Sequence, residues 1–412
     1  MRPLGIPTLE DRLEDRLVQM VLKLILEPIY EAVFKNCSLG FRPDRGPLNA
    51  IGQVKGYMNP QLQYNWVIEA DIRDCFGNID HTLLLQRMKT KVKDKRILSL
   101  TRSFLKAGVL EDGKIRYPVS GSPQGGIISP LLANIYLDQM DEVYENKYHV
   151  LSCYQRSKKV KEGKPVLRLI RYADDFVLLA KGDRSIAEDA LRELQSIVES
   201  DLKMELAEEK TGIHRLEDGF NFLGYSFRRG PSLRTRKIST ILLPAKESMI
   251  RIYRKIKEMT SSSTAFMKPN DLIKKLNYIV RGWAQYFRYG WVSRQFAKLD
   301  FYLHHRFGRW LRKKFRPHPT GKKKRRPSIG SWKWVRTRYM RRDILGRQRW
   351  WGGEDYLDLL SKSFPPIRPV FLVRDIVTIY SRDINQTCFR KPGLVHGSVL
   401  GMESSIQRHR NW

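Results

Sequence analysis

Several features that would place a protein in a class at once are missing from this sequence. No apolar run approaches the roughly 18 residues needed to cross a bilayer, and the helical stretch 17–29 is interrupted by Lys23 and Glu27. No signal-peptide pattern opens the chain. The four cysteines are widely spaced and form no Cys-x-x-Cys pair, so neither a disulfide framework nor a zinc site is indicated. We therefore expect a cytoplasmic protein with no membrane segment.

Acidic residues are also scarce for a chain of 412 residues. Only 43 Asp and Glu stand against 76 Lys and Arg, which leaves a formal net charge of +33. A field of this size predicts a polyanionic partner; nucleic acid is the first expectation and an anionic membrane surface is the alternative. The length is sufficient for two to four compact units with cores of their own.

The few acids include three at the ends of predicted strands. Apolar, β-rich runs flank the pair Asp174 and Asp175 within residues 166–180, which predicts a hairpin with two carboxylates at its tip. Another predicted strand, 64–71, ends in Asp71. Adjacent carboxylates near apolar walls are costly unless cations neutralise them, and strand-terminal aspartates from distant segments can converge on two hard divalent cations. The alternative is a solvated Asp-Asp turn.

Together with Ser-Pro-Gln-Gly-Gly at 122–126, these segments resemble motifs A, B and C of reverse transcriptases, in particular those of the group II intron reverse transcriptase/maturase family. Four further segments occur in the family's order, at residues 2–7, 38–43, 208–211 and 222–225. The resemblance covers residues 2 to about 227. It implies an α+β right-hand polymerase, with a palm of antiparallel strands backed by helices, partial fingers, an α-helical thumb and a basic C-terminal extension.

Resemblance and composition divide the chain into four expected regions. They are partial fingers at 1–65, a palm at 66–228 with inserted helices at 80–107, a thumb/maturase region at 229–315 and a basic nucleic-acid-binding extension at 316–412. The segment that opens the chain lies well inside family members, so part of the fingers is expected to be missing. The Cys/His spacing of the endonuclease module that some members carry is absent from the sequence.

The resemblance implies an RNA-directed DNA polymerase that extends a primer 3′-hydroxyl on an RNA template. Asp71, Asp174 and Asp175 would hold two Mg²⁺ ions, for which Mn²⁺ can substitute, and Lys210 would protonate the pyrophosphate leaving group. Implied partners are intron RNA, an RNA template, a DNA primer or target DNA, and dNTPs, near the nucleoid of a bacterial host. The implied role includes splicing and mobility of the encoding intron. Two alternatives stay open: a non-catalytic RNA-binding splicing factor, and a free-standing relative in phage defence or DNA repair.

Five positions resemble the family's substrate-binding residues. Arg2 would face the phosphates of the incoming nucleotide, and Arg42 would lie near template and nucleotide. Phe76, five residues after the first aspartate, would lie under the sugar and exclude a 2′-hydroxyl. Gln124 and Gly125 would approach the duplex closely. Each position has an ordinary alternative. Arg2 would be an exposed arginine, Arg42 part of a turn and Phe76 a core residue, and Gln124 and Gly125 would form a Gly-rich turn before a helix.

Further residues suggest contact with a nucleic-acid strand. Phe222 and Gly224 fall in a predicted hairpin, 220–227, that would grip the primer. Trp283 and Tyr286 could stack on bases, although aromatics on a helix are more often core. Five consecutive cations within an aromatic-containing basic region suit phosphate contact: Lys322, Lys323, Lys324, Arg325 and Arg326.

Helical periodicity adds two expectations. Three amphipathic helices are predicted at 244–260, 270–289 and 295–315, as a thumb requires. Near the start of the chain, apolar residues recur at helical spacing and predict a stripe that packs in the core. This stripe consists of Leu13, Leu17, Met20, Val21 and Leu24.

Overall fold

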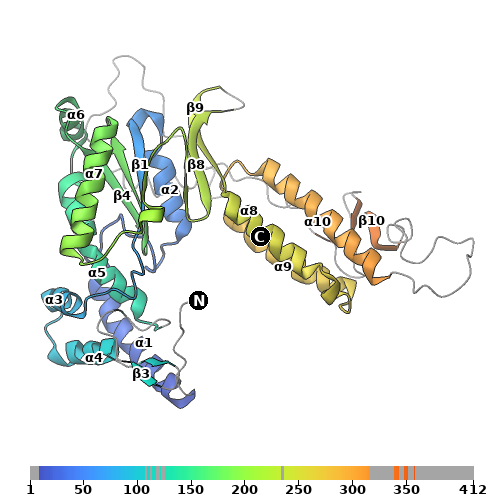
Figure 1. The fold of residues 1–412 in the computed structure, drawn as a ribbon, viewed down its shortest axis with the longest axis horizontal. Helices are drawn as coiled ribbons and strands as arrows, with labels where there is room; N and C mark the ends of the chain where they lie inside the picture. The colour runs from blue at the N-terminus through green and yellow to red at the C-terminus, as the bar shows by residue number, and fades with distance from the viewer. Residues whose placement is uncertain are drawn as a thin grey trace, which may run out of the picture.

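A computed structural model describes residues 9–106, 109–111, 114–116, 121, 126–232, 236–315, 338–342, 348–350 and 357. Its centre is a four-stranded antiparallel sheet with the order β4-β5-β1-β6 (Figure 1). The strands are β1 (Tyr64–Asp71), β4 (Val166–Tyr172), β5 (Asp175–Lys181) and β6 (Gly212–Arg215). The antiparallel sheet expected for the palm is therefore confirmed, together with the hairpin at 166–180.

Both faces of this sheet are covered at β1, β4 and β5, and alternate residues of these strands enter different cores. In β5, Phe176, Leu178 and Ala180 belong to one hydrophobic cluster, whereas Val177 and Leu179 belong to a second. A strand covered on both faces reads as a continuous apolar run, which is the pattern seen in the sequence. The first cluster is covered by α1 (Leu9–Glu31), α3 (His81–Lys91), α5 (Ser129–Tyr144) and α7 (Arg184–Ser196).

The second cluster joins the sheet to a three-helix arm. It includes residues of α2 (Pro47–Tyr57) and of the sheet β7 (Phe220–Phe222), β8 (Tyr225–Pro231) and β9 (Ile238–Pro244). The arm consists of α8 (Lys246–Met259), α9 (Pro269–Phe287) and α10 (Ser293–Lys314), and it extends away from the central sheet (Figure 1). The three predicted helices are confirmed to within a few residues. The expected boundaries after residues 65 and 228 fall inside β1 and β8 and do not coincide with element ends.

The remaining elements are short or peripheral. They are α4 (Lys95–Lys106), α6 (Cys153–Lys161), β2 (Val109–Glu111), β3 (Lys114–Arg116), β10 (Met340–Arg342), β11 (Gln348–Trp350) and five helical turns at Pro60–Leu62, Glu145–His149, Ile197–Asp201, Glu208–Lys210 and Ser262–Thr264. The pair α3 and α4 fits the helices expected at 80–107. Within the described part of the chain, no helix combines the length and apolarity that a membrane crossing requires.

The apolar stripe expected in the core on α1 is largely exposed. Leu17 is 67% exposed and Leu24 62%. The buried face is instead the one that carries Leu22, Leu26 and Tyr30. The prediction was wrong because apolar residues surround most of this helix, so that periodicity alone does not select the face that packs.

Candidate active site

The central strands bring two of the predicted aspartates into direct register. Asp71, at the end of β1, is paired with Asp175, at the start of β5. Asp175 also pairs with Tyr172 across the β4–β5 hairpin, which leaves Ala173 and Asp174 as a two-residue turn. Directly opposed residues of an antiparallel pair project from the same face about 5 Å apart. The three aspartates therefore lie at one end of one strand pair.

Electrostatics at this end of the sheet are dominated by carboxylates. Desolvation, together with the neighbouring charges of Asp174 and Asp71, raises the pKa of Asp175 to about 6, although the residue is open to solvent. Lys210 forms an ion pair with Asp71, and this hydrogen bond raises the pKa of the lysine. The predicted general acid is thus brought to the aspartates, while its chemical role stays a prediction.

These residues fit a pair of hard divalent cations. Three carboxylates supply the oxygen ligands that such ions prefer. Desolvation first, and then the charges of Asp174 and Asp71, raise the pKa of Asp175, so a cation beside it would stabilise the carboxylate. The ammonium of Lys210, 62% exposed at its side chain, marks a position on Asp71 where positive charge is stabilised. Asp71, Asp174 and Asp175 are therefore the residues that could hold metal ions.

A buried arginine fixes the turn that carries Asp174. The side chain of Arg171 is fully buried and ion-paired with the buried Asp141, whose Oδ1 accepts a hydrogen bond from Nε at 2.9 Å. Its Nη1 donates to Asn134 Oδ1 at 2.9 Å and to the carbonyl oxygen of Ala173 at 3.0 Å. Its Nη2 donates to Ser38 Oγ at 2.7 Å. The guanidinium thereby joins the turn to α5 and to the loop at residue 38.

That loop also contacts the backbone of the turn. The Leu39 amide donates to the Arg171 carbonyl at 2.9 Å, and Asn134 Nδ2 donates to the Gly40 carbonyl at 2.8 Å. A Cβ on Gly40 would lie 2.2 Å from the backbone nitrogen of Ala173, so only glycine permits this approach. Ala173 itself has φ of 59°, in the left-handed region. The turn is therefore held in an uncommon conformation from two sides.

Arg42 does not face the site as expected. It is 6% exposed, and its guanidinium is engaged with Glu31 and with the carbonyls of Lys35 and Ser38. The substrate-binding role predicted for it was wrong, because a guanidinium that satisfies its donors inside the protein stabilises the loop instead. The sequence offered no sign of the glutamate that pairs with it.

A phenylalanine of the loop at residues 38–43 packs against a phenylalanine that follows β1. The ring of Phe41, a residue that is 51% exposed, meets the half-buried Phe76 edge-on with centroids 6.5 Å apart. Phe76 also packs against the first core cluster, so its selective role stays a prediction. Sequence reasoning missed Phe41, although it stands inside the Gly-Phe-Arg-Pro segment that resembles the family.

The hairpin expected to grip the primer forms, but its phenylalanine points inward. Phe222 is 5% exposed and belongs to the second core, so its predicted contact with nucleic acid was wrong. Gly224 occupies the β7–β8 turn with φ of 77°, and its carbonyl accepts a hydrogen bond from Ser248 Oγ at 2.9 Å. Eight predicted site residues lie outside the described residues: Arg2, Gln124, Gly125, Lys322, Lys323, Lys324, Arg325 and Arg326.

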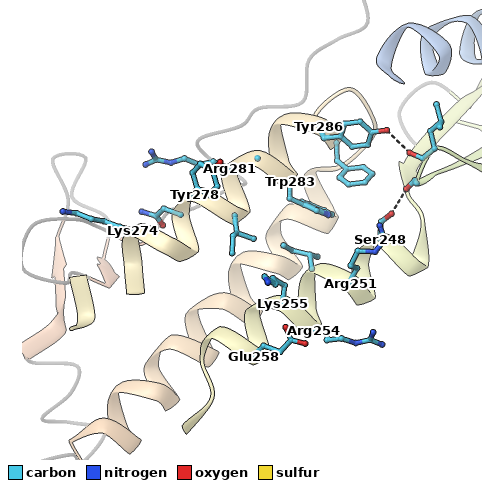
Figure 2. Close-up of a pocket in the computed structure, with 17 residues that line it drawn as sticks. Ser248, Arg251, Arg254, Lys255, Glu258, Lys274, Tyr278, Arg281, Trp283 and Tyr286 are labelled. Carbon is cyan, nitrogen blue, oxygen red and sulfur yellow. Dashed lines mark hydrogen bonds between the residues drawn. The ribbon is translucent and has the colours of Figure 1, made fainter. Parts of the chain in front are cut away.

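Beside this hairpin, α8 and α9 enclose a groove of about 1300 Å³. Trp283 and Tyr286 line it while packing against the second core, and the Tyr286 hydroxyl donates to the Leu223 carbonyl at 2.9 Å (Figure 2). Its lining includes one acid, Glu258, and five cations: Arg251, Arg254, Lys255, Lys274 and Arg281. The prediction did not include these cations, although the i, i+3, i+4 spacing of those on α8 shows a basic face.

Among the described residues, the one group of three potential metal ligands whose donor atoms all lie within 4.8 Å of one another is not the aspartates but a cluster behind the sheet. This cluster consists of Cys37, Glu145 and His149, with one donor atom each. However, His149 Nε2 accepts a hydrogen bond from the Leu169 amide, so Nδ1 carries the proton and donates to Glu145. Burial lowers the pKa of His149, which favours this neutral form. Both ring nitrogens are occupied, and the group is a hydrogen-bonded part of the core.

Comparison with known proteins agrees with this geometry. Residues 1–227 match the family model of the reverse transcriptase (RNA-dependent DNA polymerase), and residues 249–328 match the group II intron, maturase-specific domain. The chain belongs to the reverse transcriptase family, and within it to the group II intron reverse transcriptase/maturase type. The family predicted from the sequence is confirmed.

Individual relatives cover the chain in part. The group II intron-encoded protein LtrA of Lactococcus lactis subsp. cremoris is 35% identical, over 55% of this chain and 44% of LtrA. Protein YkfC of Escherichia coli (strain K12) is 36% identical, over 58% of this chain and 67% of YkfC. A solved structure of telomerase from Candida albicans in complex with a telomeric RNA fragment aligns with a TM-score of 0.40 and 11% identity, covering 80% of this chain and 60% of that one.

Proposed function

We propose that the chain is an RNA-directed DNA polymerase that extends a primer 3′-hydroxyl on an RNA template. The observation that carries the proposal is the register of Asp71 with Asp175 beside the turn of Asp174. Reverse transcriptases as a family use divalent metal ions, and a binding protein without catalysis has no need of aspartates gathered in this way. As the alignments span only part of the relatives, activity and partners are inferred here from the site.

In this proposal the three aspartates hold two Mg²⁺ ions, with Mn²⁺ as a possible substitute. The bound ions would lower the pKa of the attacking hydroxyl and neutralise charge on the triphosphate. Lys210, a lysine that is protonated at neutral pH, would donate a proton to the leaving pyrophosphate. Phe76, braced by Phe41, would exclude the 2′-hydroxyl of a ribonucleotide.

The second part of the proposal concerns nucleic acid. We assign the central sheet to the palm and the three-helix arm to the thumb, with the groove between α8 and α9 holding a nucleic-acid backbone. Its five cations suit phosphates, and Trp283 and Tyr286 offer ring faces. Intron RNA, RNA template and DNA primer are the proposed occupants, and splicing and mobility of the encoding intron are the proposed biological role. The basic run 322–326 would extend this surface.

Primer extension separates the proposal from its alternatives. With an RNA template, a DNA primer, dNTPs and Mg²⁺, the Asp174→Asn/Asp175→Asn variant should lose extension by at least about 10³-fold, because charge stabilisation at the reacting phosphate is lost. RNA binding should be unchanged. The matched control is Asp189→Asn, which removes an exposed carboxylate on α7. Extension that persists in the double variant would refute the site, and an inactive parent protein that binds RNA would favour a splicing factor without polymerase activity.

A further inference from the structure

A cluster of cations lies at the end of the sheet opposite the aspartates. Lys181, the last residue of β5, is in register with Val166 on one side and Tyr64 on the other. It lies six positions along β5 from Asp175, which corresponds to roughly 20 Å along a strand. Desolvation lowers the pKa of Lys181, and the nearby charges of Arg156 and Arg168 lower it further. Three cations from α6, β4 and β5 therefore converge at this end.

Two of these cations lie against tyrosine rings. Arg168 is 8% exposed, and its guanidinium lies over the ring of Tyr57 at 5.4 Å. The ammonium of Lys181 lies over the ring of Tyr64 at 5.0 Å. Within the described part of the chain, no ion pair is formed by either cation and Arg168 Nε has no hydrogen-bond partner, although Tyr57, Tyr64 and the charge of Glu145 raise the pKa of Arg168 against its desolvation. Buried cations of this kind stabilise an anion, as clustered carboxylates stabilise a metal ion.

Helix α6, on the surface beside Arg168 and Lys181, adds further positive charge. Helix α6 begins with a capping box formed by Ser152 and Gln155, so it is a well-defined element. Its sequence, Cys-Tyr-Gln-Arg-Ser-Lys-Lys-Val-Lys, contains four cations and no acid. Tyr154 on this helix is 77% exposed. Glu162, just after the helix, pairs with Lys158 and Lys164 and is the one acid in the segment 150–165.

We propose that this surface binds the phosphate backbone of a structured RNA, separately from the template in the active site. We call it the α6 patch, and it consists of Arg156, Lys158, Lys159, Lys161, Arg168 and Lys181. RNA is chosen over a lipid surface because the chain belongs to the reverse transcriptase family and carries a maturase-specific domain of group II introns. Tyr154 offers a face for stacking. The inference rests on the proposed function only for the choice of RNA as the anion.

The test measures binding of a 20-base-pair RNA hairpin to the full chain over a range of salt, without dNTPs. Lys158→Gln/Lys159→Gln/Lys161→Gln should weaken binding at 0.15 M salt by at least about tenfold. The slope of the logarithm of the binding constant against the logarithm of the salt concentration should also become shallower by about 2 to 3, because each lost phosphate contact removes about one unit of slope. Lys181→Met, which keeps an apolar stem over Tyr64, should weaken binding as well. Extension on a short template should not change in either variant.

The control removes the same charge elsewhere. Lys89, Lys91 and Lys95 are exposed residues of α3 and α4, and α3 lies far from α6 (Figure 1). Changing all three to Gln should weaken hairpin binding less than about twofold if contacts matter more than net charge. Equal losses in both triple variants, or no loss in the α6 variant, would overturn the proposal. So would patch-dependent binding to phosphatidylserine vesicles with RNA binding unchanged. Because the assay needs no catalysis, an inactive polymerase would leave its outcome unaffected.

Discussion

The ion pair of Arg171 with Asp141 makes a prediction that separates stability from positioning. Both side chains are fully buried, so changing Asp141→Leu leaves a guanidinium without its countercharge inside the core. Removing one partner of a buried pair costs about 3–5 kcal/mol. Against a typical total of about 5–15 kcal/mol, this is a large fraction of the free energy of unfolding. Urea unfolding followed by tryptophan fluorescence measures the loss.

The double variant Arg171→Met/Asp141→Leu removes both charges at similar volume. Replacing a buried pair with apolar residues is often neutral, although the partners Asn134 and Ser38 are left unpaired at about 1–3 kcal/mol each. The double variant should therefore be more stable than the single one. Yet the Ala173 carbonyl has lost the donor that holds it. Primer extension should stay low, with a weakened response to Mg²⁺.

Two results would contradict this reasoning. If the free energy of unfolding of the Asp141→Leu variant were within about 1 kcal/mol of the parent value, the arginine would not depend on Asp141 as its countercharge in the core. A double variant that is stably folded and extends primers at the parent rate would mean that the turn carrying Asp174 does not depend on Arg171. Arg171→Lys serves as the conservative comparison, because it keeps the charge and loses the bidentate geometry.

Three further predictions concern the same end of the sheet. Gly40→Ala should lower extension at least about tenfold with RNA binding retained, because its Cβ would collide with the Ala173 backbone and displace the turn. Asp175→Asn should raise the urea midpoint at pH 7 without divalent ions. The folded pKa of Asp175, about 6, lies above the unfolded value, so its contribution to stability falls as the pH rises from about 4 to 6. This gain should vanish below pH 4, and a midpoint that is unchanged at pH 7 would contradict it. Phe76→Ala should admit ribonucleotides more readily in single-nucleotide extension, and unchanged discrimination would leave Phe76 with a packing role alone.

The sequence predicted the aspartates well because their position follows from local pattern. A continuous apolar run defines β5, and β4 is apolar apart from two arginines and its last residue; the carboxylates stand between the two runs. Once β1 pairs with β5, the register of the two strands places Asp71 opposite Asp175. The arm was predicted for a similar reason, since three amphipathic helices give a strong periodic signal.

Features that depend on contacts between distant segments were not predicted. In sequence, Arg171 is a charged residue in an apolar strand, and nothing nearby indicates that Asp141 and Asn134 meet it. The inward position of Phe222 depends on which face of its hairpin the arm covers. For α1 the apolar residues go round the helix, so the choice of buried face is made by tertiary packing.

The contrast between Asp141 and the aspartates at the end of the sheet supports the proposed metal site. Asp141 has its charge balanced by a guanidinium inside the core, and neither side chain of that pair is exposed. Asp71 has a lysine whose side chain is 62% exposed and can move away, while the pKa of Asp175 is raised in the presence of its acidic neighbours. A carboxylate that is fully paired in the core cannot take up another cation without losing its partner. In the proposed site, divalent ions would therefore bind at this end of the sheet, and the fixed turn beside it would supply the third ligand without a large ordering cost.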